Sequence, residues 1–167
     1  SRAGVVALAP SFDHVGILAR DMTLIATAYD ALQGPDSRDP VCSDRDPDPC
    51  VPGLDDGIGD ARIAVLDDHF ATFGWPECFV AVEQVARALG ADRRVTFPDA
   101  GRAIVAALLI TSSEAAGLHL DDLQNHGDLL DPVVRDRMGA GALVPAAWIN
   151  HLQRFRRAYR DRVMGVT

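Results

Sequence analysis

The sequence predicts an α/β fold, because it contains one strand–helix–strand pattern flanked by helical repeats of apolar residues. Residues 62–66 and 93–97 are rich in residues that favour strands, and an amphipathic helical pattern lies between them. This order is that of a βαβ unit, whose two strands run parallel. Apolar residues spaced by threes and fours before and after the unit predict further helices.

The first segment is predicted to be extended and to lead into a helix. Residues 5–18 alternate only loosely between apolar and polar and contain Pro10 and Gly16, which disfavour a helix. Asp21 is a suitable N-cap, and Gly34 with the proline after it is typical of a helix end. The apolar face of this helix consists of Leu24, Ile25, Ala28 and Leu32.

Residues 34–60 predict an acidic, proline-rich loop. They hold five prolines and eight aspartates against Arg38 and Arg45, so most of the net charge of −8 falls in this segment. A loop of this length in a compact domain is either a surface excursion or partly disordered. Its negative charge argues against nucleic-acid binding there.

The helix of the βαβ unit is predicted to begin at Pro76, because proline is favoured in the first turn. It is predicted to end at Gly90. Its inward-facing residues should be Phe79, Val82, Ala86 and Leu89.

Two long helices are expected after the second strand. Asp99 can cap the first of them, in which residues 103–110 are apolar all round, so we expect burial on most sides. Within a chain this short, such a helix suggests neighbours outside the sequence. The second spans about 144–163, and its apolar residues are Val144, Trp148, Leu152, Phe155, Tyr159 and Val163.

Composition indicates a cytoplasmic protein. No run of 18 or more apolar residues and no basic start with an apolar stretch is present, which argues against a membrane span and a secretory signal. Three cysteines without a CxxC spacing fit reduced thiols better than disulfides.

Three clusters of polar residues could suggest a metal site, acid–base chemistry or nucleic-acid binding. A structural role explains each of them better. His119 and His126 lie seven apart around two aspartates, Asp121 and Asp122, whereas helical metal sites favour pairs four apart. A solvated loop is therefore expected there. Asp13, beside His14, is expected to fix a local turn through the backbone. Five arginines at 154–162 suit the C-terminal end of a helix better than a nucleic-acid site.

The order of several short motifs resembles the amidase signature family over nearly the whole length. Residues 11–16 match its S-x-D-x-V-G-P pattern, with Ile17 in place of the proline. Further matching segments follow in family order, at residues 18–22, 34–36, 38–40, 113–116 and 154–157. The chain looks most similar to amidases related to allophanate and carboxybiuret hydrolases, with the amidase-like component of glutamyl-tRNA amidotransferase more distant.

The resemblance implies a partial amidase-signature α/β/α sandwich, with a mixed sheet, the βαβ unit and long buried helices. Residues 1–167 are then expected to be the middle or C-terminal part of one such domain. Family members hydrolyse amides with a serine nucleophile, a bridging cis-serine and a lysine base, without a metal or cofactor. The sequence has 16 basic residues, none of them lysine, and no Gly/Ser-rich signature. No catalytic residue is therefore assigned.

The resemblance also points to a substrate-binding arginine. In several relatives an arginine after the Ser-Glu-Ala element, here residues 113–115, binds the substrate's carboxylate. Arg137 occupies that place, and Arg135 is the near alternative. The other interpretation is an exposed helical arginine paired with Asp131 or Asp136.

The expected function is accordingly that of part of an amidase that cleaves a small linear amide or ureido C–N bond. The alternative is a non-catalytic truncated paralogue that serves as a binding or partner module. Expected partners are a small amide or ureido substrate and either the missing half of the domain or a second copy of the chain. Neither nucleic acid nor a membrane is expected.

Overall fold

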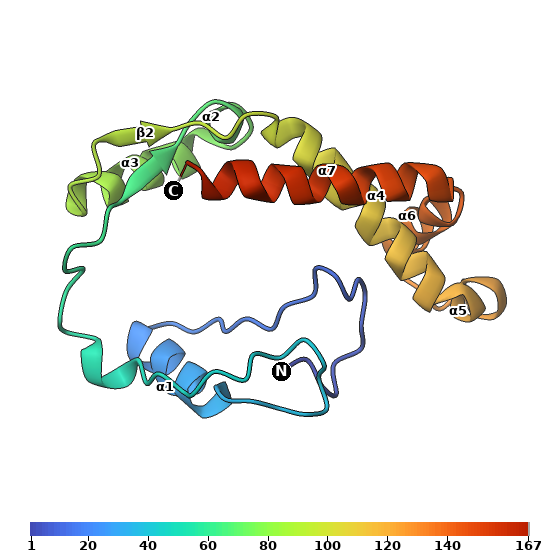
Figure 1. Cartoon of the computed structure of the whole chain (residues 1–167), viewed down its shortest axis with the longest axis horizontal. Helices are drawn as coiled ribbons and strands as arrows, with labels where there is room; N and C mark the ends of the chain where they lie inside the picture. Colours follow the sequence, from blue (N-terminus) through green and yellow to red (C-terminus); the bar gives the residue numbers. More distant parts are fainter. Residues whose placement is uncertain (167) are drawn as a thin grey trace. The chain divides into compact units, whose positions relative to one another are not determined.

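The computed structural model describes residues 1–166, which form two compact units, one of residues 1–61 and one that begins at Arg62. The first unit is mostly loop, whereas the second contains the two strands and most of the helices (Figure 1). The α/β class is therefore confirmed.

The first unit contains helix α1, Met22–Leu32, and a short 3-10 helix, η1, Val51–Gly53. Residues 5–18 contain no helix or strand, as predicted. Asp21 caps α1, because its carboxylate accepts a hydrogen bond of 2.9 Å from the backbone N–H of Leu24. The predicted apolar face is wrong in part, since Leu24 and Leu32 are exposed and Ala26 is the residue of α1 that is buried.

The acidic loop is attached to α1 by hydrogen bonds. The Asp30 carboxylate accepts from the backbone N–H groups of Cys50, at 2.7 Å, and Val51, at 3.0 Å. These bonds hold the pKa of Asp30 below its ordinary value. The Gln33 side chain exchanges two hydrogen bonds with the backbone of Asp48. The loop is thus a surface excursion whose return to α1 is specified by side chains.

The second unit begins with the predicted βαβ unit. Strands β1, Ala64–Leu66, and β2, Arg93–Val95, pair in parallel with Ala64 opposite Arg93. Between them lie α2, His69–Thr72, which the sequence pattern did not indicate, and α3, Pro76–Ala88. Within the described residues the sheet consists of these two strands.

The predicted burial of this unit is wrong in part. In β1 the central Val65 is buried, and in α3 the buried residue is Ala86. Val82 and Leu89, which were expected to face inward, are 49% and 37% exposed. A two-stranded sheet is too narrow to cover a helix of this length, so part of the apolar face of α3 stays uncovered.

The long helices of the second unit pack on one another. Helix α4, Ala100–Leu118, contacts both α6, Pro132–Ala142, and α7, Ala146–Met164, and the short α5, Leu120–Asn125, connects α4 to α6 (Figure 1). The prediction that α4 is buried on most sides is wrong. Ile110 is fully buried, whereas residues on other sides are exposed, among them Ile104, Val105 and Leu108.

Asp99 takes a different role from the predicted cap. It precedes α4 with a φ of 63° and its side chain makes no capping bond. Its carboxylate instead pairs with Arg102, at 3.3 Å, and with Arg162 of α7, at 2.9 Å. The Arg162 guanidinium also lies 5.8 Å from the ring centroid of Phe155. The Asp99–Arg162 pair ties the end of α7 to the start of α4.

Helix α4 is also the helix of the described chain that is long and apolar enough to cross a membrane by length and composition. A core helix of a soluble protein meets the same criteria. Here α4 places its buried residues, Ala106, Ile110, Ala115 and Ala116 among them, on helices α6 and α7.

Candidate functional site

The local sequence sets the start of helix α6. The Asp131 carboxylate accepts hydrogen bonds from the backbone N–H groups of Val133, at 2.9 Å, and Val134, at 3.3 Å. Pro132 fills the first helical position, where its missing N–H costs nothing. Aspartate followed by proline is thus a helix-start signal that fixes where the arginines of α6 lie.

Helices α4 and α6 cross in direct backbone contact. Gly141 is buried, and a Cβ at this position would overlap the carbonyl oxygen of Ser112 and lie 2.8 Å from the backbone nitrogen of Ser113. Met138, one turn earlier on the same face, is also buried. The crossing therefore lies at the start of the Ser-Glu-Ala element, which sequence analysis had linked to the arginines.

Of the two candidate arginines, Arg137 is the one without a counter-charge. Its side chain is exposed and, within residues 1–166, has no hydrogen bond or ion pair. Arg135 instead pairs with Asp136 at 3.0 Å. Asp131 is engaged as the helix cap. The alternative pairing of Arg137 with either aspartate is therefore not present, and its guanidinium is available to an anion.

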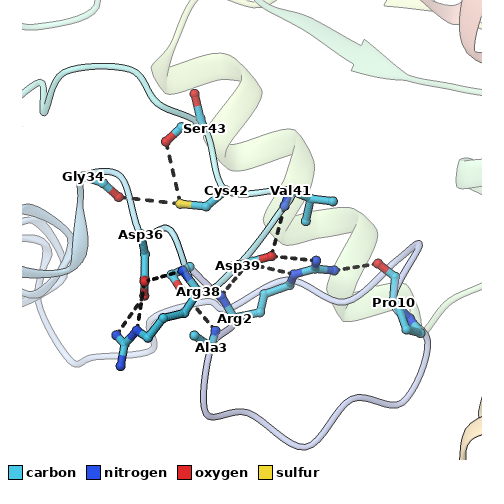
Figure 2. Close-up of polar contacts among 11 residues, drawn as sticks. Arg2, Ala3, Pro10, Gly34, Asp36, Arg38, Asp39, Val41, Cys42 and Ser43 are labelled. Atoms are coloured by element: carbon cyan, nitrogen blue, oxygen red, sulfur yellow. Dashed lines mark hydrogen bonds and ion pairs between the residues drawn. The ribbon is translucent and has the colours of Figure 1, made fainter.

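The first unit contains a second polar cluster, built on Arg2 and Asp39 (Figure 2). Arg2 donates to the Asp39 carboxylate from its backbone N–H at 2.7 Å, from Nε at 3.2 Å and from Nη2 at 3.0 Å. Its Nη1 donates to the carbonyl oxygen of Pro10. Asp39 is 7% exposed. The hydrogen bonds from Arg2 hold the pKa of Asp39 well below its usual range.

This cluster is structural, because each of its groups already has a partner. Asp13 accepts from the backbone N–H groups of Leu8, at 2.9 Å, and Ala9, at 3.0 Å, so it fixes the local turn as predicted. Sequence reasoning missed the Arg2–Asp39 pair. Its residues lie 37 positions apart, and no local sequence pattern links them.

Asp39→Asn is expected to destabilise the first unit at neutral pH, because it removes the charge that compensates the half-buried Arg2. The folded-state pKa of Asp39 lies below its unfolded value of about 3.9. Its contribution to stability is therefore complete above roughly pH 4 and declines as the pH falls toward the folded value. The Asn variant should lose this part of the acid dependence.

Hydrogen exchange at the amides of Arg2 and Val41, both of which donate to Asp39, measures the effect locally. Asp46→Asn is the control, because Asp46 is exposed and without a partner in residues 1–166. Equal exchange in both variants between pH 3 and 7 would show that the pair contributes nothing.

The histidine cluster lies on and beside helix α5, so the predicted solvated loop is wrong in its secondary structure. His119 contacts Asp122 at 3.2 Å, and Asn125 donates to Asp121 at 2.8 Å. Within residues 1–166 no three His, Cys, Asp or Glu side chains are arranged to hold a metal ion.

Comparison with known proteins shows the family to which the chain belongs. The model of the amidase family matches residues 1–163 of the chain. The chain belongs to the amidase signature family. The resemblance inferred from the short motifs is therefore confirmed, and the α4–α6 crossing is part of an amidase fold.

Two curated relatives show what the chain is similar to. AtzE of Pseudomonas sp. (strain ADP), a component of 1-carboxybiuret hydrolase, is 45% identical over 163 residues, which are 98% of this chain and 36% of the relative. The matching component of the glutamyl-tRNA(Gln) amidotransferase of Pelobacter propionicus (strain DSM 2379 / NBRC 103807 / OttBd1) is 32% identical over 120 residues, 70% of this chain and 25% of the relative.

Two solved structures share the fold. One, described as an unexpected vestigial protein complex that reveals the evolutionary origins of an s-triazine catabolic enzyme, is 44% identical with a TM-score of 0.93. The match covers 99% of this chain and 36% of the chain in that structure. An inhibitor-bound form of that complex is 45% identical with a TM-score of 0.80, over 86% of this chain and 31% of the other. The chain thus spans about a third of the proteins it matches.

Proposed function

We propose that this chain is part of an amidase that hydrolyses a small linear amide or ureido C–N bond of a carboxylate-bearing substrate. In this proposal the chain supplies scaffold, and Arg137 binds the carboxylate. The observation that carries the proposal is an exposed, uncompensated arginine on α6, one turn before the crossing with α4, in a chain of the amidase family. The similarity to a component of 1-carboxybiuret hydrolase supports the substrate class.

The chemistry of Arg137 suits this role. A guanidinium binds a carboxylate through two parallel charge-assisted hydrogen bonds, which fix both the position and the orientation of the substrate. Arg135 suits it less, because Asp136 already occupies its guanidinium at 3.0 Å. A ligand carboxylate would have to displace that pair.

The catalytic groups are proposed to come from the remainder of the domain. In the family mechanism a serine forms an acyl-enzyme, lysine and a second serine relay protons, and backbone amides stabilise the oxyanion. The chain contains no lysine. It therefore cannot supply the base of that mechanism from within these 167 residues.

The 167-residue chain alone is expected to release no ammonia from simple amides, biuret or allophanate, because it has no lysine base. The intact protein that contains the chain is expected to release it. Ammonia release by repurified samples measures both. Turnover by the chain alone that survives repurification would contradict the proposal that the catalytic groups lie in the remainder of the domain.

The alternative is a non-catalytic paralogue that acts as a partner module. It draws support from the two structural neighbours, which are described as a vestigial protein complex. Under this alternative the intact protein also releases no ammonia but forms a stable complex. The same measurement therefore separates the two functions.

The chain alone is expected to associate in solution, because it leaves apolar side chains uncovered on several elements. Trp75 beside α3, Val85 of α3 and Val105 of α4 are 77%, 58% and 55% exposed. Exposed apolar surface of this kind marks interfaces. The proposed occupant is the remainder of the amidase domain or a second copy of the chain.

Light scattering over a wide concentration range tests this expectation. Dimers or larger species should form, and adding the remainder of the domain should reduce them if that is the natural partner. A monomer with a cooperative melt at every concentration would contradict it.

A further inference from the structure

The contact between α4 and α6 is closer than side chains would allow. At Gly141 a Cβ would overlap the Ser112 carbonyl oxygen, and real Cβ atoms essentially never come within 3.0 Å of such an atom. Ser112 is itself buried, at 9% exposed. The two backbones therefore meet with no side chain between them, so the distance between the helices is set by the absence of a side chain at position 141.

Arg137 lies one helical turn before this contact. Residues four apart share a helix face, so Arg137 projects from the side of α6 on which Gly141 meets α4. Met138, next in sequence, is buried on α6, the helix that contacts α4. Arg137 itself is exposed. The backbone that carries Arg137 is therefore fixed by the buried positions 138 and 141, while the Arg137 side chain itself is exposed.

We propose that Gly141 is a positioning residue for the carboxylate-binding site, because it fixes the position of Arg137 relative to α4. The inference rests on the proposed function of Arg137. A bidentate contact requires the guanidinium to match the carboxylate in both distance and plane. A displacement of about 1 Å from a productive geometry can cost on the order of 100-fold in rate. Any side chain at position 141 forces α6 away from α4 and moves Arg137 with it.

The test compares Gly141→Ala with Gly139→Ala in the intact amidase that contains this chain. Both glycines lie on α6. A Cβ at Gly139 meets nothing within 4 Å, so this variant is the matched control. The substrates are carboxybiuret, which bears a carboxylate, and biuret, which does not. The quantity measured is the ratio of kcat/KM for the acidic substrate to that for the neutral one.

Gly141→Ala is expected to lower this ratio about tenfold or more, mainly through a higher KM for the acidic substrate. Gly139→Ala should keep the wild-type ratio. A purely structural defect would instead lower the fraction of folded enzyme. It would therefore reduce the apparent kcat/KM for both substrates by the same factor. An unchanged ratio, or an equal loss for both substrates, would overturn the inference.

A double variant separates this inference from the proposed function. If Gly141 acts through Arg137, then Gly141→Ala should not lower the ratio further in an Arg137→Ala background. If Arg137→Ala alone keeps the wild-type ratio, the proposed function fails, whatever Gly141→Ala does. If Arg137→Ala lowers the ratio and Gly141→Ala does not, the positioning role fails while the proposed function stands.

A second variant covers the case in which Gly141→Ala does not fold. Met138→Ala loosens the same contact by removing atoms instead of adding them, so no overlap arises. It is expected to lower the ratio for the same reason, with KM for the acidic substrate raised. A folded Met138→Ala enzyme with the wild-type ratio would overturn the positioning role on its own.

Discussion

Gly141→Ala is expected to lower the free energy of unfolding by about 1–3 kcal/mol, the usual cost of inserting atoms into a packed contact. The change runs against helix propensity, since alanine is the better helix former by about 1 kcal/mol. The added Cβ would overlap the Ser112 carbonyl oxygen, which is part of the α4 backbone and cannot rotate away. The helices must separate, and the burial of Met138 is then lost in part.

Gly139→Ala on the same helix should be neutral or stabilising by up to about 1 kcal/mol, because its Cβ meets nothing within 4 Å. Urea unfolding of the intact protein gives the overall change, and hydrogen exchange of the α4 and α6 amides locates it. Equal stability of the two variants would show that the helices do not meet at Gly141.

Arg137→Ala is expected to weaken binding of a carboxylate-bearing substrate roughly ten- to hundredfold in the intact protein. A lost charge-assisted hydrogen bond to a carboxylate typically costs ~1.5–3 kcal/mol. Arg137→Lys should lose nearly as much, because an ammonium cannot reproduce the planar two-pronged donor. Titration with the acidic substrate, or KM where chemistry is slow, measures the loss.

Arg157→Ala on α7 is the matched control, because Arg157 is also exposed and has no ion pair in residues 1–166. It should leave substrate affinity unchanged. Both arginines should tolerate alanine within about 0.5 kcal/mol of stability, as surface residues usually do. Normal binding and turnover of the acidic substrate by both Arg137 variants would make Arg137 an ordinary surface residue.

Local signals predicted the elements well where the signal and its cause lie close together in sequence. The Asp21 cap acts three residues away, on Leu24, and α1 begins where expected. Pro76 begins α3, and Gly90 follows its end with a φ of 64°. Parallel pairing of β1 with β2 followed from their order alone.

Burial was predicted less well, because periodicity gives the face of a helix but not what covers it. Val82 of α3 and Ile104 of α4 are apolar and exposed, since neither the narrow sheet nor α6 and α7 extends over them. Asp99 shows a related difficulty. A cap and an ion pair compete for one carboxylate, and Arg162, 63 residues away, decides the outcome.

Neither the family resemblance nor the structure alone identifies the candidate site. Arg137 was predicted from the resemblance, and no feature of its local sequence distinguishes it from Arg135. The structure separates the two, because Asp136 pairs with Arg135 and leaves Arg137 uncompensated. The contact at Gly141 could not be predicted, since a glycine in a helical segment gives no indication of which backbone lies against it.

The preference of the intact wild-type protein between carboxybiuret and biuret is the most direct test of whether Arg137 binds a substrate carboxylate. Both offer ureido C–N bonds, and the first adds the carboxylate that Arg137 is proposed to bind. Ammonia release at equal concentrations well below KM gives the ratio of kcat/KM. We expect a preference for carboxybiuret of at least about tenfold, which is the contribution of one charge-assisted contact. Equal rates, or a preference for biuret, would contradict it.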